Sequence, residues 1–255
     1  MNVGPIRAVL DRAAGAGREL RLWWRDDDAV TATPELDRLL ALARAVGAPV
    51  AIAAIPARLH VSLRMRLRDE AGARILVHGL AHANHAAPGR KKAEFGDDRP
   101  LGTLAADAGA GLARARDLAG PLLLPVFVPP WNRVTATLTP LLPGLGYAGL
   151  STFGTVRPCP DLVVLNTHLD PVDWRGSRGA LESLALAAAL ERALADRQDA
   201  PIGLLTHHLM FDEPHWAATA EILECLATHP AVRFPSLEEL WSAEGRHCTV
   251  TCLMT

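Results

Sequence analysis

The chain of 255 residues has few cysteines, little net charge and no long apolar run, and each absence excludes a class of protein. Four cysteines without a Cys-x-x-Cys pair are too few for a disulfide scaffold of this length. A formal net charge of −2 does not favour electrostatic binding to nucleic acid or to an anionic membrane. No apolar run reaches the roughly 18 residues that a membrane span requires. We therefore expect neither nucleic acid nor membrane among its partners.

The two ends of the chain carry little functional signal. The N-terminal segment has no apolar core of signal-peptide length and is typical of an amphipathic surface helix, so we expect a cytoplasmic protein. At the C-terminus, His247, Cys248 and Cys252 offer soft metal ligands, but a frayed tail is the interpretation that we favour. The sequence does not indicate an oligomeric state.

The remaining composition favours one α/β domain spanning residues 1–255. With 49% hydrophobic and 21% charged residues, the chain can bury a sizeable core. Short apolar runs alternate with helical patterns, which is typical of repeated βα units. The expected strands are 20–25, 50–55, 75–77, 126–128, 147–152, 162–166 and 202–206, with a terminal strand and helix between 232 and 242.

Polar residues gather just after these expected strands. They are Asp26–Asp28, His78, Trp131–Asn132, His168–Asp170 and His207–His208. In a parallel α/β barrel the carboxyl ends of the strands converge on one face, where active sites are built. The pattern therefore predicts a functional site on that face.

Two of these groups together offer the ligands of a catalytic metal ion. His78 and His82 are four residues apart, so one helical turn would place both imidazoles on one face. One of three consecutive acids, residues 26–28, could complete the set, and its neighbour could take a proton from activated water. If the fold keeps the groups apart, they are a polar strand end and a polar loop. For His85 we favour a supporting or surface role over a third ligand.

The arrangement resembles the polysaccharide deacetylases, carbohydrate esterase family 4, across residues 24–208. That family carries five ordered motifs: Thr-Phe-Asp-Asp-Gly, His-Ser/Thr-x-x-His, Arg-x-Pro-Tyr, Asp-x-x-Asp-Trp and Leu-x-His. The counterparts here are Asp26-Asp27, His78-x-x-x-His82, Pro130-Trp131, Asp170-x-x-Asp173-Trp174 and Leu205-x-His207. The resemblance implies a distorted (β/α) barrel of about seven strands.

The resemblance also implies roles for individual residues. Asp27, His78 and His82 would be the metal ligands, and Asp26 the general base. His207 would be the general acid, and Asp170 would tune the pKa of His207. The backbone N–H of Trp131 would stabilise the oxyanion. Trp174 and Asn132 would bind the substrate. For His207 and its neighbour His208, the alternative is a core histidine satisfied by the backbone.

Two positions depart from the family pattern. Asp28 stands where the family has glycine, so Asp27 as base and Asp28 as ligand remains an alternative. Val128 stands where the family has the arginine that pairs with the base, and Arg25 or Arg133 could replace it.

The expected function is that of a metal-dependent hydrolase. It would remove an acetyl group from an N-acetylated amino sugar or oligosaccharide, with a divalent ion for which Zn²⁺ is our first expectation. Two alternatives stay open: a metal-dependent hydrolase of small non-carbohydrate amides, and a non-catalytic protein that binds metal or saccharide.

Overall fold

The structure, a computed structural model, describes residues 2–155, 157–196 and 200–242. The C-terminal candidates His247, Cys248 and Cys252 lie outside the described residues. That residues 1–255 form a single domain stays a prediction.

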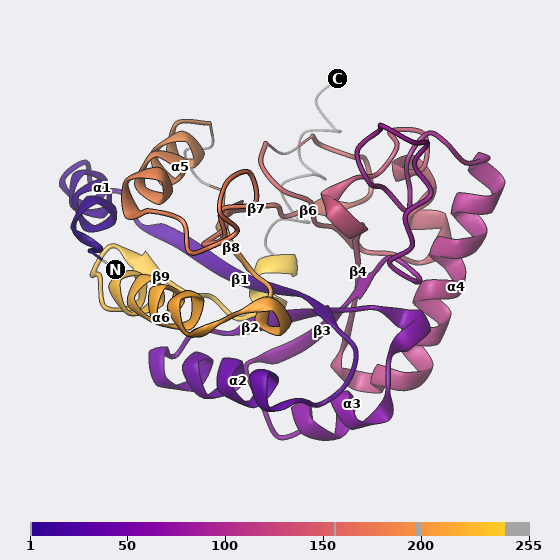
Figure 1. Ribbon diagram of the computed structural model, residues 1–255, viewed down its shortest axis with the longest axis horizontal. Helices are drawn as coiled ribbons and strands as arrows, with labels where there is room; N and C mark the ends of the chain where they lie inside the picture. Colours follow the sequence, from indigo (N-terminus) through magenta and orange to yellow (C-terminus); the bar gives the residue numbers. More distant parts are fainter. Residues whose placement is uncertain (1, 156, 197–199, 243–255) are drawn as a thin grey trace.

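A parallel sheet forms the centre of the molecule (Figure 1). Its strands are β1 (Leu20–Ala29), β2 (Val50–Ala54), β3 (Ala73–His78), β4 (Leu123–Val128), β5 (Gly149–Leu150), β6 (Val163–Val164), β7 (Thr167–Leu169), β8 (Ile202–Thr206) and β9 (Val232–Arg233). The order is β6-β5-β4-β3-β2-β1-β8-β7, and β9 pairs with β1. Within the described residues the end strands β6 and β7 do not pair, and one isolated bridge, Phe153 with Thr167, connects the segment after β5 to β7. The sheet is therefore a curled, incomplete barrel. The expected α/β barrel class is confirmed.

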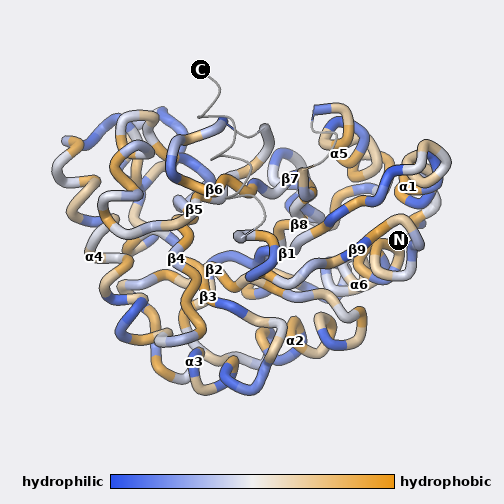
Figure 2. Tube along the Cα trace, turned by 180° about the vertical axis from the view of Figure 1, so that it is seen from behind, coloured by the Kyte–Doolittle hydropathy of each residue, from blue (hydrophilic) through white to orange (hydrophobic). Residues whose placement is uncertain are grey.

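Helices cover the outer side of the curled sheet (Figure 1). They are α1 (Gly4–Gly15), α2 (Pro34–Val46), α3 (Val61–Leu67), α4 (Leu101–Ala119), α5 (Ser183–Asp196) and α6 (Glu213–Ala227). Residues 237–242 are also helical. Figure 2 shows orange and blue stretches alternating along these helices, as expected where one face is buried. No helix in the described part of the chain is long and apolar enough to cross a bilayer.

Local sequence signals explain the boundaries of α2. The Thr33 hydroxyl accepts a hydrogen bond from the Leu36 N–H at 3.1 Å, and Pro34 occupies the first turn. Gly47 ends the helix in the left-handed conformation, with φ 66°. These signals were read correctly from the sequence, because each acts over three or four residues.

Side chains on β1 alternate between two environments. Leu22 and Trp24 pack in the large cluster that includes the outer helices, whereas Trp23 packs inside the barrel with Leu76 and Val128. Because successive strand residues point to opposite faces, Arg25 and Asp27 follow Trp23 into the interior. Asp26 shares the outer face of Trp24.

The sheet differs from the expected one in extent. Strand β1 does not end at Arg25 but continues through the three acids to Ala29. Strand β9 falls within the expected terminal strand, whereas β7 was not expected and pairs with β8. A strand as short as β7 has too few residues to show a period of two in the sequence.

Candidate functional site

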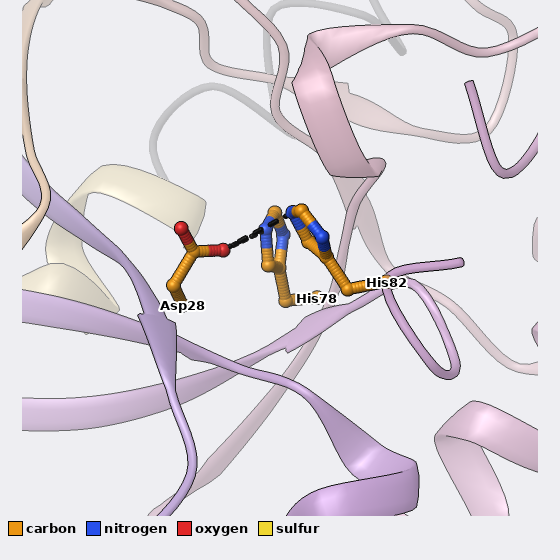
Figure 3. A group of neighbouring side chains, drawn as sticks. All are labelled: Asp28, His78 and His82. Carbon is orange, nitrogen blue, oxygen red and sulfur yellow. Dashed lines mark hydrogen bonds and ion pairs between the residues drawn. The ribbon is translucent and has the colours of Figure 1, made fainter. Parts of the chain in front are cut away.

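Asp28, His78 and His82 converge in the structure (Figure 3). Asp28 Oδ1 lies 3.1 Å from His78 Nε2 and 3.2 Å from His82 Nε2. One ligand atom from each of the three residues lies within 4.8 Å of the others. The structure thus brings the two expected histidines together, with Asp28 as the neighbouring acid.

A bulge in β1 presents Asp28 to the histidines. Asp26 pairs with Ile52 and Ala29 with Ala54, so three steps along β1 oppose two along β2. Asp28 itself has φ 76°, in the left-handed region that aspartate enters more readily than most residues. The extra residue breaks the strict alternation of side chains along β1. Asp28 can therefore reach the same site as Asp27, which faces the interior.

The two histidines lie on a strand end and a loop rather than on the single helical turn that their spacing suggested. His78 ends β3, and His82 has φ 56° in the loop beyond it. Gly79, between them, also has a positive φ of 59°, and a Cβ there would lie 2.3 Å from Glu94 Oε2 and 2.6 Å from Pro130 Cδ. Only glycine fits this turn, which returns the chain toward Asp28.

Each imidazole has a contact that orients it. The Nδ1 of buried His78 lies 3.0 Å from the Val128 carbonyl oxygen, to which it donates, so Nε2 is free to act as a ligand. The His82 ring packs against the Trp131 ring with centroids 4.3 Å apart. The expected site residue Trp131 therefore lies directly beside the histidine group.

Charges around Asp28 favour its ionised form. Burial raises the pKa of Asp28, but its hydrogen bond with His78 and the nearby imidazoles outweigh burial and hold this pKa well below its usual range. Burial lowers the pKa of His82, against the attraction of Asp28. Burial also acts to lower the pKa of His78, but Asp27 and Asp28 raise it overall. An anionic carboxylate that faces two imidazoles is a donor set suited to a zinc-type dication.

Glu94 supports the loop that carries His82. Its side chain is 1% exposed. Glu94 accepts hydrogen bonds from the backbone N–H groups of Leu80 at 3.2 Å, Ala81 at 2.8 Å and Ala83 at 3.4 Å. Sequence patterns did not indicate this role of Glu94, because it depends on contacts that span more than ten residues.

Arg25 and Asp27 form a buried ion pair on the inner face of β1. Arg25 Nε lies 2.9 Å from Asp27 Oδ1, and Arg25 Nη2 donates to Asp27 Oδ2 at 3.1 Å. The guanidinium also donates to Ser151 Oγ and to Asn132 Oδ1, both at 2.6 Å. Arg25 thus reaches from β1 across to the segment that follows β5, and it holds both oxygens of the Asp27 carboxylate.

The contacts distinguish between the two arginines that could replace the one missing at Val128. Val128 is fully buried among the inward-facing apolar residues. Arg133 donates to the Lys92 carbonyl oxygen at 2.6 Å, whereas Arg25 contacts the acid. A guanidinium is therefore present beside a carboxylate of the first motif, supplied from β1.

Asp26 lies on the other face of β1 and does not join the histidine group. Its Oδ2 accepts from the Thr206 hydroxyl at 2.6 Å and from the His208 N–H at 3.0 Å, and its Oδ1 contacts His208 Nδ1. Both Asp26 and His208 are fully buried. Since Asp26 is enclosed by these partners, the geometry offers it no path to a substrate.

The expected residues from the later motifs form a second group near Asp28. The Trp174 ring, 43% exposed, contacts the His207 ring edge-on with centroids 5.0 Å apart, and its Nε1 donates to Asp170 Oδ2 at 2.7 Å. Burial raises the pKa of Asp170, although the nearby His207 ring and the hydrogen bond from Trp174 oppose this rise. His207 is also close enough to Asp28 to help lower the pKa of that acid. The structure thus brings the two groups to one site.

Comparison with solved structures identifies the fold. No family model matches the sequence, and no curated protein matches it. A protein from Mycobacterium smegmatis, assigned as a polysaccharide deacetylase, superposes with a TM-score of 0.60 at 18% identity, covering 86% of this chain and 78% of that chain. A family 4 acetyl xylan esterase from Clostridium thermocellum, determined with a cobalt ion, gives 0.53 at 18% identity, with coverage of 88% and 91%. A Bacillus subtilis peptidoglycan deacetylase gives 0.55 at 12% identity, with coverage of 92% and 96%.

These similarities define a class of fold. The chain has the fold of the polysaccharide deacetylases and family 4 carbohydrate esterases over most of its length. At identities below 20% the likeness establishes the fold alone. The function has to be argued from the site.

Proposed function

We propose that this chain is a metal-dependent hydrolase that removes an acetyl group from an N-acetylated amino sugar or oligosaccharide. The observation that carries the proposal is the convergence of Asp28, His78 and His82 beside the Arg25–Asp27 ion pair, within a polysaccharide deacetylase fold.

Asp28, His78 and His82 are the residues that would hold the ion. This assignment moves the ligand by one position from the sequence expectation of Asp27, because the bulge places Asp28 against the histidines. Two imidazoles and a carboxylate suit Zn²⁺ and leave positions open for water and substrate. When bound, such an ion would polarise the acyl carbonyl and lower the pKa of nearby water.

Asp27 is the general base in this proposal, in place of Asp26. It is one residue from the proposed ligand and faces the interior, and Arg25 holds both of its oxygens. The nearby guanidinium orients the carboxylate, so that it can accept a proton from the attacking water. The backbone N–H of Trp131 would donate a hydrogen bond to the developing oxyanion.

His207 is the general acid that would protonate the departing nitrogen. Trp174 packs against its ring, and Asp170 anchors Trp174 by accepting a hydrogen bond from the indole Nε1. Trp174 is exposed enough to contact a sugar face as well. Asn132, expected to bind the substrate, accepts a hydrogen bond from Arg25, and we assign it to holding that guanidinium.

The test of the proposal is acetate release from N-acetylated chito-oligosaccharides by zinc-loaded protein, with small N-acetyl amides assayed in parallel. We expect turnover of the oligosaccharides that disappears after treatment with a chelator and returns with zinc. Turnover of the small amides alone would contradict the carbohydrate assignment. Bound zinc without turnover on either set would favour a binding protein.

Loss of the Glu94 carboxylate is expected to weaken zinc binding without touching a ligand. In Glu94→Gln an NH2 group, which cannot accept a hydrogen bond, replaces one carboxylate oxygen, so the loop loses part of its support. We expect zinc affinity to fall by about 10–100-fold, the range for supporting hydrogen bonds, in a competition titration with a chromophoric chelator. The matched control is Glu191→Gln, at an exposed glutamate paired with Arg12 on the outer helices. Equal affinities in the two variants would contradict this role.

Removal of the Arg25 charge is expected to destabilise the metal-free protein. Arg25→Gln leaves the buried Asp27 carboxylate without its cation, which costs about 3–5 kcal/mol. Urea unfolding in the presence of a chelator measures this cost. Arg233→Gln, at a half-exposed arginine paired with Glu19 and Glu239, should cost only about 0–1 kcal/mol. If both variants lowered the free energy of unfolding by a similar small amount, the Arg25–Asp27 ion pair would not be important for stability.

A further inference from the structure

The Asp26–His208 pair is a buried polar cluster that the proposed chemistry does not use. Both side chains are fully buried on the outer face of the sheet. The cluster extends to Trp24, whose Nε1 donates to the Thr206 hydroxyl at 2.8 Å, and the same hydroxyl donates to Asp26. The Asp26 carboxylate therefore joins β1 to the end of β8 through both a side chain and a backbone group.

These contacts lie where the β1–β8 ladder ends. The last register pair is Asp26 with Thr206, and beyond it His208 begins a short 3₁₀ turn, His208–Met210. The Asp26 carboxylate accepts the His208 N–H at 3.0 Å, so it extends the connection between the strands past the ladder. The residue held between these two anchored positions is His207.

Strand alternation turns the pair and the candidate catalytic groups to opposite sides. On β1, Asp26 faces outward, while Asp27 on its C-terminal side faces the interior with Arg25. On the other chain segment, His208 is fully buried against Asp26, while His207 contacts Trp174 at the site. One outer contact therefore links the two backbone segments that carry the proposed base and the proposed acid.

We propose that Asp26 and His208 are positioning residues that set the placement of His207 relative to Asp27 and Asp28. The expected effect on catalysis rests on the proposed function, whereas the expected effect on the placement of His207 does not. Burying a carboxylate and an imidazole is costly, and apolar residues of similar size would pack this layer at least as well. A role in fixing the orientation of His207 therefore explains the Asp26–His208 pair better than a contribution to the stability of the fold does.

The chain provides a matched control for a purely structural role. His229, 3% exposed, places its Nε2 3.1 Å from Asp11 Oδ1. This contact between a buried histidine and an exposed aspartate joins the segment after α6 to α1, outside the candidate site. Its removal should lower stability as removal of the first pair does, without moving His207.

The test compares His208→Leu, His208→Asn and His229→Leu by kinetics on zinc-loaded protein and by NMR of the ¹⁵N-labelled histidine rings. In His208→Leu we expect kcat to fall about 100-fold, as for a misplacement of about 1 Å, with KM and zinc content unchanged. The His207 ring signals should shift or broaden. His208→Asn can still donate from the position of Nδ1 and should recover part of both effects, whereas His229→Leu should show neither.

Unchanged His207 ring signals in His208→Leu would overturn the positioning role, whatever the activity. Loss of stability with kcat intact would do the same. If the wild-type protein releases no acetate, the proposed function fails, but the ring signals still decide the inference. Should His208→Leu not fold, Asp26→Asn provides the same readouts, with a smaller displacement of His207 expected because one acceptor oxygen remains.

Discussion

Asp27→Asn is expected to lower kcat by about 10²- to 10⁴-fold, the contribution of a general base, while zinc remains bound. Asparagine keeps the shape of the side chain but cannot accept the proton. Because Asp28, rather than Asp27, contacts the two histidines, no ligand is lost. Acetate release by the zinc-loaded variant, with zinc content determined on the same sample, measures both parts of the expectation.

Asp37→Asn is the matched control for this substitution. Asp37 is an exposed aspartate on α2 whose partner is Arg66, so it tests the effect of losing an aspartate that pairs with an arginine outside the site. We expect its kcat to equal that of the wild type. Full turnover in Asp27→Asn would remove Asp27 from the proposed base position.

His78→Ala is expected to abolish stable zinc binding and, with it, turnover. His78 is fully enclosed, and its Nε2 is held toward Asp28 by the contact of Nδ1 with the Val128 carbonyl. Loss of a ligand should weaken zinc binding by more than the roughly 10–100-fold expected for a supporting hydrogen bond. Equilibrium dialysis at low zinc concentration, followed by metal analysis, gives the affinity.

His85→Ala is the control within the same histidine run. His85 is exposed and lies outside the group that converges on Asp28. The sequence favoured a supporting or surface role for it over that of a ligand. Its loss should leave zinc affinity unchanged. Equal zinc affinity in wild type and His78→Ala would contradict the proposed site.

Local patterns in the sequence were enough to predict the class of fold and the histidine pair. The cap at Thr33 and the stop at Gly47 act within one helical turn and were read correctly. The strand that delivers His78 was short, but its apolar run was unambiguous. Alternation along β1 puts Trp23 and Asp27 on one face, but two consecutive tryptophans do not indicate which face is inward, so the choice of Asp27 over Asp26 needed the fold.

The features that the sequence could not provide depend on contacts between distant segments. The bulge at Asp28 forms against β2, and nothing in three consecutive acids indicates which of them takes the positive φ. Glu94 supports the loop that carries His82 by accepting hydrogen bonds from backbone N–H groups that lie more than ten residues earlier in the chain. Arg25 was one of two candidates for the guanidinium missing at Val128, and only the fold shows that it meets Asp27.

Zinc stoichiometry in Asp27→Asn and Asp28→Asn, measured side by side on metal-loaded and dialysed protein, tests the central claim most directly. The geometry predicts that Asp27→Asn retains zinc and loses turnover, whereas Asp28→Asn loses both. Retention of zinc by Asp28→Asn with its loss from Asp27→Asn would contradict the account and return the ligand to Asp27.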